Sequence, residues 1–289
     1  MLALVRRNVK IYFRNRGAWI ASLLTVFIII GLYALFLGSQ LSQSLEGVGL
    51  ESPKLLTDSW IMAGIISIMP FSVSLGAVSI VNDRSKGLFK DFYCSPISRS
   101  RITLGYILSL AIISFIITMF GLVLGEIYIV SSGGELLSFI DIIKVIGIIA
   151  LDDLAATSIM TFIAMFISSE STYTAVSTVI GTILGFITGI YIPVGSLPEG
   201  VGNVVKCFPI SHAGSMLRQI FTSTAVDECT KAIPADIKSS VIEEINSEMG
   251  IVYSFGEHSV TNTESVIFLV TTALIFFVLT AFAARRKKK

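Results

Sequence analysis

The stretch ITLGYILSLAIISFIITMFGLVLGEIYIV, residues 102–130, contains Glu126 as its single charged residue. A helix of this length rises about 43 Å, which exceeds the roughly 30 Å hydrocarbon core of a bilayer. In lipid, a helix is the open-ended structure that satisfies every backbone polar group internally. The stretch therefore predicts a transmembrane helix that is long enough to tilt or bend.

The whole chain has the composition of a membrane protein. Of its 289 residues, 53% are hydrophobic and only 14% are charged, whereas soluble domains carry about 25% charged residues. The net charge of +1 gives no basic character that would bind nucleic acid. His212 and His258 stand far apart, so no zinc-ligand spacing is present. The pattern G-x-x-x-x-G-K-[ST] is absent, so any ATP that is used would be bound by another chain.

Six apolar stretches are candidates for membrane spans, and helices satisfy the backbone in each of them. The expected fold is therefore an all-α integral membrane protein, with one transmembrane domain over residues 1–289. The expected spans are residues 19–38, 60–81, 102–130, 142–167, 174–192 and 266–284.

The distribution of Lys and Arg predicts the orientation of these spans. Residues 1–18, 82–101 and 285–289 hold five each, whereas six are spread over the opposite side. Positive residues accumulate on the cytoplasmic side, so we expect both termini and the 82–101 loop to be cytoplasmic, in a cell membrane. Residues 193–265 would then lie outside. The first span fits a retained signal anchor better than a cleaved signal peptide, whose charged and apolar regions are shorter.

Residues 2–16, LALVRRNVKIYFRNR, predict an amphipathic helix on the inner leaflet. The apolar face would hold Leu2, Val5, Val9, Tyr12 and Phe13. Two interpretations remain open: an anchor on membrane lipids, or a docking surface for a cytoplasmic partner. The residues that would make either contact are Arg6, Arg7, Lys10, Tyr12, Phe13 and Arg14.

The 82–101 loop, NDRSKGLFKDFYCSPISRSR, has more detail than orientation alone requires. Apolar and aromatic residues, including Leu88 and Phe89, lie between Lys86, Lys90 and Asp91. The pattern predicts a short helix parallel to the membrane, with an exposed apolar ridge that suits a groove on a partner. An ordinary positive-inside loop is the alternative.

The segment after the fifth expected span is too polar to cross the membrane. Pro193, Pro198 and Pro209 divide it into short pieces, which predicts re-entrant or interfacial helices on the outer face. Residues 225–263 form a polar insertion that continues outside.

These features together resemble the permease subunit of type-2 ABC exporters, over nearly the whole chain. The 82–101 loop matches the family pattern at Asp83, Arg84, Gly87, Ser95, Pro96, Ser98 and Arg99. Leu197-Pro198, and Pro209 followed by His212, match the family's later motifs.

The resemblance implies that the 82–101 loop is a coupling helix, seated in a groove of a separate ATPase subunit. Two permeases, identical or related, and two ATPase subunits would form the exporter, and ATP and magnesium would be bound by the ATPase. The substrate would be a drug, an antibiotic, a peptide or a lipid-like amphiphile. The implied coupling residues are Asp83, Arg84, Gly87, Leu88, Phe89, Asp91, Ser95, Pro96 and Arg99.

Asp152 and Asp153 lie near the middle of the fourth expected span. A carboxylate at the bilayer midplane costs about 2.5–3.5 kcal/mol, so neither is expected to face lipid. They could form a cation-attracting site on the translocation path, or a hydrated break that caps the rest of the helix. We expect Glu126, near the outer end of residues 102–130, to be a solvated residue at the mouth.

Gly181, Gly185 and Gly189 recur every four residues in the fifth expected span, which predicts close helix contact. That contact could be packing within the chain or the seam of a dimer. Cys207 and Cys229 both fall in the outer segment, where a disulfide between them is an option in an oxidising exterior.

Three other classes of membrane protein compete with an ABC permease. A secondary transporter should show internal repeats, and none is found between the two halves. An intramembrane protease needs its catalytic pair on two spans, whereas Asp152 and Asp153 are adjacent on one helix. A channel or a sensory subunit would not need the 82–101 pattern.

Overall fold

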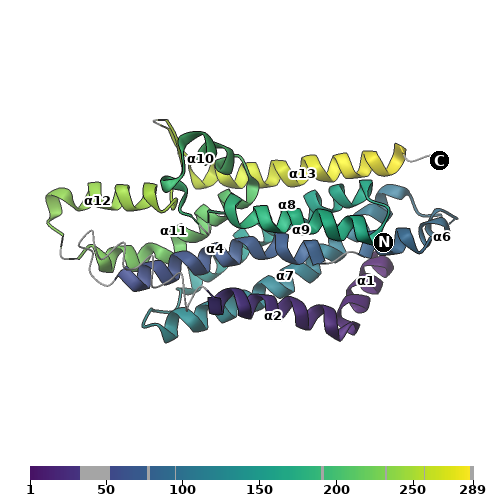
Figure 1. Cartoon of the computed structure of the whole chain (residues 1–289), viewed down its shortest axis with the longest axis horizontal. Coiled ribbons are helices and arrows are strands. Elements are labelled where there is room, and N and C mark those ends of the chain that lie inside the picture. The colour runs from purple at the N-terminus through teal and green to yellow at the C-terminus, as the bar shows by residue number, and fades with distance from the viewer. Residues whose placement is uncertain are drawn as a thin grey trace.

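The computed structural model describes residues 1–32, 53–76, 79–94, 96–189, 192–231, 233–256 and 258–286. Helices dominate it and run mainly along the long axis of the molecule (Figure 1). Within the described residues, the sheet consists of one antiparallel pair, β1 (Ser254–Phe255) and β2 (His258–Ser259). The predicted all-α class is confirmed.

The described helices follow one another along the chain. They are α1 Leu2–Arg14, α2 Arg16–Leu32, α4 Pro53–Gly76, α5 Ser79–Ser85, α6 Phe89–Cys94, α7 Arg99–Ser131, α8 Phe139–Phe166, α9 Glu170–Ile187, η2 Val194–Ser196, α10 Glu199–Lys206, α11 Pro209–Cys229, α12 Ala235–Glu248 and α13 Asn262–Arg286.

Three described helices are long and apolar enough to cross a membrane: Pro53–Ser85, Arg99–Ser131 and Asn262–Ala284. A fourth crossing is reached if Leu2–Arg14 and Trp19–Leu32, which meet at an angle of 70°, form one broken span. The predicted stretch 102–130 is thus a single helix. The count of six spans stays a prediction, and part of the first one, residues 33–38, lies outside the described residues.

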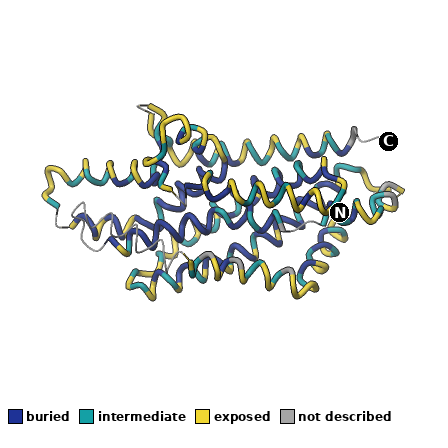
Figure 2. The backbone as a smooth tube through the Cα atoms, in the orientation of Figure 1, coloured by how far each residue is buried: buried dark blue, intermediate teal, exposed yellow. Residues whose placement is uncertain are grey.

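The Pro53–Ser85 helix lies at the centre of the bundle, and 80% of its apolar 18-residue stretch is buried inside the protein. The corresponding stretch of Asn262–Ala284 is only 11% buried. Figure 2 shows the same contrast between a buried interior and an exposed α13. Trp60 and Ile65 of α4 pack with Leu217 and Phe221 of α11 in the largest apolar cluster. Since lipid would replace water around the bundle, α13 has the surface expected of a helix at its edge.

Helix α1 packs across the start of α7 and is amphipathic, as predicted. Val5, Asn8 and Tyr12 are buried, and the side-chain amide of Asn8 donates a hydrogen bond to Ser109 at 3.1 Å. The one departure is Leu2, expected on the apolar face, which is 77% exposed. The sharp angle between α1 and α2 is the geometry that a helix lying along a membrane surface requires before the chain turns inward.

The segment that follows α9 is helical, as expected, but it does not simply cover the outer face. Helix α11 is inserted among α4, α8 and α13, and nearly all residues from Pro209 to Leu217 are buried. Its small residues, Gly214 among them, allow this close approach: a Cβ at Gly214 would lie 3.2 Å from the Ser67 hydroxyl. Polar composition therefore concealed a core helix.

The predicted disulfide between Cys207 and Cys229 is wrong, because both thiols are free. Cys207 is exposed just before α11 begins, and Cys229 is buried in the last turn of the same helix. A helix of 21 residues is about 30 Å long, whereas a disulfide needs Cα atoms closer than about 7 Å.

Candidate coupling site and membrane acids

Asp83 is the centre of a clamp at the end of the bundle that carries α1 and α6. Its two carboxylate oxygens accept hydrogen bonds from the Arg7 guanidinium at 2.6 and 2.9 Å. The Tyr106 hydroxyl donates a third hydrogen bond to Asp83 at 2.6 Å. A bidentate Arg–carboxylate pair fixes orientation as well as distance. The Asp83 clamp, made of Arg7, Asp83 and Tyr106, therefore ties α1, α5 and α7 together.

Arg84, the next residue, holds the end of α8. Its Nη1 donates to the carbonyl oxygens of Ala164, Met165 and Ile167 at 3.0, 2.9 and 2.7 Å. The last carbonyls of a helix lack partners within the helix and carry partial negative charge, so a guanidinium satisfies and neutralises them. The Asp-Arg pair of the sequence motif thus links the loop to three neighbouring helices.

Gly87 makes the turn between α5 and α6. Its φ of +76° lies in the left-handed region, which glycine adopts without the penalty of a Cβ atom. The backbone N–H of Gly87 donates to the backbone carbonyl oxygen of Arg84 at 3.0 Å, and that of Leu88 donates to the backbone carbonyl oxygen of Asp83 at 2.9 Å. The two crossed bonds are those of a helix that ends in a glycine turn, after which α6 begins at Phe89.

Phe89 and Phe92 of α6 turn inward, which corrects the prediction that they form an exposed apolar ridge. Phe89 is half-buried and stacks on Tyr106, with ring centroids 5.8 Å apart. Phe92 is also half-buried, and the Arg7 guanidinium lies 5.7 Å from its ring centroid. Both rings pack against the cluster that contains Ile80. They stabilise the loop rather than offering the surface that was expected of them.

The exposed surface of the 82–101 loop is carried by other residues. Ile97 is a large apolar residue that is 41% exposed. Leu88 and Arg99 are half-buried, and Ser95 lies outside the described residues. Among the described residues of the loop, the exposed ones are Ser85, Lys86, Asp91, Cys94, Pro96, Ile97, Ser98 and Arg101. A partner that contacts this loop would therefore meet Asp91, Pro96 and Ile97 before any clamp residue.

The basic residues of α1 divide between the clamp and the surface. Arg6, Lys10 and Arg14 are exposed, whereas Arg7 is half-buried against Asp83. Phe13 is half-buried and packs its ring edge-on against buried Tyr12. Sequence reasoning placed Arg7 among the surface residues because its partner lies 76 positions away.

The acidic pair, Asp152 and Asp153, is buried inside the bundle, 1% and 2% exposed. Asp152 is the fourteenth of the 28 residues of α8, so it lies halfway along that helix. Neither of its carboxylate oxygens has a hydrogen-bond partner among the described residues, and one oxygen of Asp153 also lacks one. Buried polar groups are nearly always satisfied, so the Asp152 carboxyl, which has no partner for either oxygen among the described residues, is an unusual feature at mid-helix.

Of the three regularly spaced glycines, Gly181 and Gly185 lie on the inner side of α9, and Gly189 follows the end of that helix. A Cβ at Gly181 would lie 3.6 Å from the Leu75 side chain of α4, and Gly185 is buried. Gly189 has a φ of +64° and ends the helix in a turn against Val194. The glycine face thus contacts its own chain, and the exposed face of α9 carries larger residues such as Val179 and Phe186.

Sequence reasoning missed a buried arginine, Arg218, that joins several segments far from the Asp83 clamp. Arg218 of α11 is completely buried and donates to the carbonyl oxygens of Thr188 and Gly189 at 3.1 and 3.2 Å. Its guanidinium lies 4.3 Å from the ring centroid of Trp60, whose indole N–H donates to Met249 at 2.6 Å. On charge alone, Arg218 was counted as one of the outer-side basic residues.

His212, the motif residue that follows Pro209, is also buried. Its Nδ1 and Nε2 atoms lie 3.0 Å from the Ser265 hydroxyl and 2.9 Å from the Lys206 carbonyl oxygen. Burial lowers the pKa of His212 below its usual 6.5. The imidazole therefore joins α10, α11 and α13 in its neutral form.

These observations define a multi-pass, all-α membrane protein in which the N-terminal helix α1 is joined to the 82–101 loop by the Arg7–Asp83 pair. The ABC-2 type transporter family matches residues 1–222 of this chain. The chain therefore belongs to the ABC-2 type transporter family, as the loop pattern predicted. A comparison with curated proteins gives no match.

Proposed function

We propose that this chain is the permease subunit of an ATP-driven exporter, forms the translocation pathway as a dimer, and is coupled to separate ATPase subunits through the 82–101 loop. Family membership supports a transporter subunit. The observation that carries the coupling proposal is the double connection of Asp83 and Arg84. A force applied to α6 would reach α1, α7 and α8 through ion-pair and hydrogen-bond contacts rather than through a flexible linker.

In this proposal the loop residues divide into two sets. Asp83, Arg84, Gly87 and Phe89 hold the loop on the bundle, whereas Asp91, Pro96 and Ile97 contact the ATPase. Association through a small exposed patch with an apolar centre and charged flanks is a common mode of recognition. ATP and magnesium would be held by the ATPase, and both termini of this chain would lie in the cytoplasm.

The acidic pair would lie on the translocation path. A carboxyl that is buried without a partner is costly, and a positively charged substrate group would supply the missing partner. The proposed substrate is therefore a drug, antibiotic, peptide or lipid-like amphiphile that bears a positive charge. Export is the proposed direction.

The decisive experiment is a pull-down from native membranes with a tagged chain, in which co-purified proteins are identified by mass spectrometry and ATP hydrolysis is assayed. The test variant is Asp91→Lys with Ile97→Asp, which changes the exposed loop surface and leaves the clamp intact. The matched control is Glu244→Lys with Ile237→Asp, which makes the same changes on the exposed face of α12.

An ATPase subunit should co-purify with the unmodified chain and the α12 control, and be lost from the loop variant. If an ATPase co-purifies equally with all three, the 82–101 loop is not the coupling surface. If none co-purifies with any of them, the exporter proposal fails, and a self-contained transporter or channel takes its place.

A further inference from the structure

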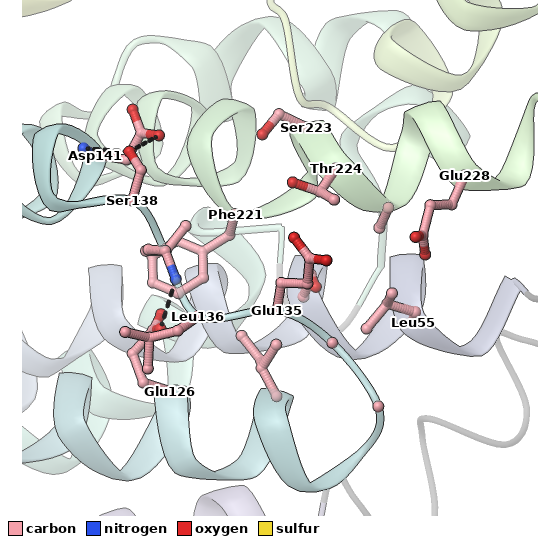
Figure 3. Close-up of a pocket in the computed structure, with 16 residues that line it drawn as sticks. Leu55, Glu126, Glu135, Leu136, Ser138, Asp141, Phe221, Ser223, Thr224 and Glu228 are labelled. Carbon is pink, nitrogen blue, oxygen red and sulfur yellow. Dashed lines mark hydrogen bonds between the residues drawn. The ribbon is translucent and has the colours of Figure 1, made fainter.

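A cavity of about 200 Å³ lies at the end of the bundle opposite to α6. It is bounded by the start of α4, the end of α7, the connection between α7 and α8, and the last turns of α11 (Figure 3). We call it the outer pocket. Helix α7 begins beside the Asp83 clamp and ends at this pocket, so the two sites are separated by the length of the bundle.

The charge of the outer pocket is entirely acidic. Glu126, Glu135, Asp141 and Glu228 line it, and none of its described lining residues is Lys, Arg or His. Asp141 is neutralised by Lys144 at 2.7 Å, and Glu228 lies 3.8 Å from Lys231. Within the described part of the chain, no ion pair involves Glu126 or Glu135. Two carboxyl groups therefore line the cavity without an ion-pair partner among the described residues.

Glu126 distinguishes this pocket from an ordinary acidic surface. It is 9% exposed, and its Oε2 accepts a hydrogen bond from the Leu137 backbone N–H at 3.3 Å, drawn in Figure 3. Its Oε1 is buried and has no hydrogen-bond partner among the described residues. A buried carboxyl group is stabilised by a positive partner or further donors, and the cavity that Glu126 lines adjoins this group. The expectation that Glu126 is a solvated residue was therefore wrong.

The remaining walls of the outer pocket are mixed, with apolar side chains beside the hydroxyls of Ser59, Ser223 and Thr224. Leu55, Ile129, Leu136 and Phe221 contribute hydrocarbon and one aromatic ring. Pockets for drug-sized ligands measure about 300–1,000 Å³, so this one suits a head group with a few attached carbons. Among the described residues, no group of three or more His, Cys, Asp or Glu side chains is arranged to hold a metal ion. An organic ammonium would meet the carboxyl groups with its charge and the Phe221 ring and neighbouring hydrocarbon with its carbon atoms.

We propose that the outer pocket binds the ammonium group of an amphipathic organic cation, with Glu126 and Glu135 as its counter-ions. For its role in transport, this inference rests on the proposed exporter function. In that setting the pocket is the last acidic site that a cationic substrate meets before release.

The geometry of α8 connects the outer pocket with the acidic pair. Asp141 and Asp152 are 11 residues apart, which places them about 20° apart around the helix and about 16 Å apart along it. Both carboxyls therefore lie on one face of α8. Val145 and Ile149, on the same side, are fully buried between them. The two acidic positions are separated by an apolar barrier in this conformation, as expected for a path that is closed between two sites.

Binding can be measured on the full chain in lipid nanodiscs by titration calorimetry, without an ATPase. The probe is phenethylammonium, and the matched neutral compound is 2-phenylethanol. The variants are Glu126→Gln and Glu135→Gln, and the control is Glu244→Gln, an exposed carboxylate on α12. Glu135 is exposed, so its variant tests the site even if Glu126→Gln does not fold.

Phenethylammonium should bind saturably, and Glu126→Gln should weaken it about tenfold, the effect of one charge-assisted hydrogen bond. Glu135→Gln should weaken it by about threefold because its solvent exposure screens the charge. The control should leave binding unchanged, and neither pocket variant should change the binding of 2-phenylethanol.

The inference is overturned if phenethylammonium shows no saturable binding, if the alcohol binds as tightly, or if both pocket variants bind like the unmodified chain. The pull-down separates this result from the exporter proposal, because Glu126→Gln and Glu135→Gln leave the 82–101 loop unchanged. Cation binding without any co-purified ATPase would keep the site and remove its role in ATP-driven export.

Discussion

Asp83 and Glu126 are both buried carboxylates at the two ends of α7, yet their surroundings are opposite. Asp83 accepts three hydrogen bonds, two of them from a guanidinium. Glu126 lines a cavity and accepts one hydrogen bond from a backbone N–H, and its second oxygen is buried without a partner among the described residues. The first arrangement stabilises a fixed structure, whereas the second leaves an electrostatic deficit that a ligand can fill. Burial alone does not distinguish a structural acid from a binding one.

The largest effect on stability is expected for Asp83→Ala, which tests whether Asp83 is a structural acid. The substitution leaves the Arg7 guanidinium and the Tyr106 hydroxyl without their common acceptor. We expect a loss of about 3 kcal/mol, at the lower end of the range for a broken buried pair because Arg7 keeps contact with water. Thermal unfolding in detergent, compared with the exposed control Asp91→Ala, measures it. An unchanged Tm would mean that the clamp contributes nothing to stability.

Gly87→Ala tests the turn that places the clamp, with a smaller expected effect. No atom lies within 4 Å of the added Cβ, so the penalty comes from the left-handed backbone alone. That penalty is about 1–2 kcal/mol for an L-residue. Gly200→Ala, on α10, is the control because it also has open space and its φ is not in the left-handed region. Equal unfolding temperatures for the two variants would contradict a left-handed backbone at Gly87.

His212 sharpens the comparison, because it is a buried titratable group satisfied in its neutral form. Burial lowers its pKa in the folded chain below 6.5, so between the folded and unfolded pKa values the unfolded chain binds more protons. Stability should therefore rise with pH in that window and fall as the pH drops below about 6.5, by at most about 1.4 kcal/mol per pH unit.

The measurement is the Tm at pH 5 to 7.5 for the unmodified chain and His212→Asn. Their difference removes the contribution of exposed His258, which both chains keep. The variant should show the shallower pH dependence. Parallel curves would mean that His212 takes up its proton equally well in the folded chain.

The acidic pair should have the smallest effect on folding. Because the Asp152 carboxyl has no partner to lose, replacing both Asp152 and Asp153 by Asn should change stability by less than about 1 kcal/mol. Transport of an organic cation into inverted vesicles should be abolished, whereas Asp227→Asn, an exposed control, should retain it. Retained transport in the double variant would remove the acidic pair from the path.

The 82–101 loop shows how much sequence patterns predict in this molecule. The positions of Asp83, Arg84 and Gly87 were singled out by the resemblance to the family pattern, and the structure gives each a distinct contact or turn. The exposed ridge was wrong, because Phe89 and Phe92 pack on Tyr106 and Arg7, which come from other helices. Period and composition describe one segment at a time and do not say which face another helix will cover.

The amino-acid sequence by itself determined the membrane class, the helices and the amphipathic α1, because hydropathy and backbone satisfaction act within a single segment. Only the tertiary structure decided which acids are paired: Asp83 pairs with Arg7, 76 positions away, whereas Glu126 has no ion pair among the described residues. It also buried α11 and kept Cys207 and Cys229 apart. The physical reason is that pairing energies depend on distances between elements, which local periodicity does not contain.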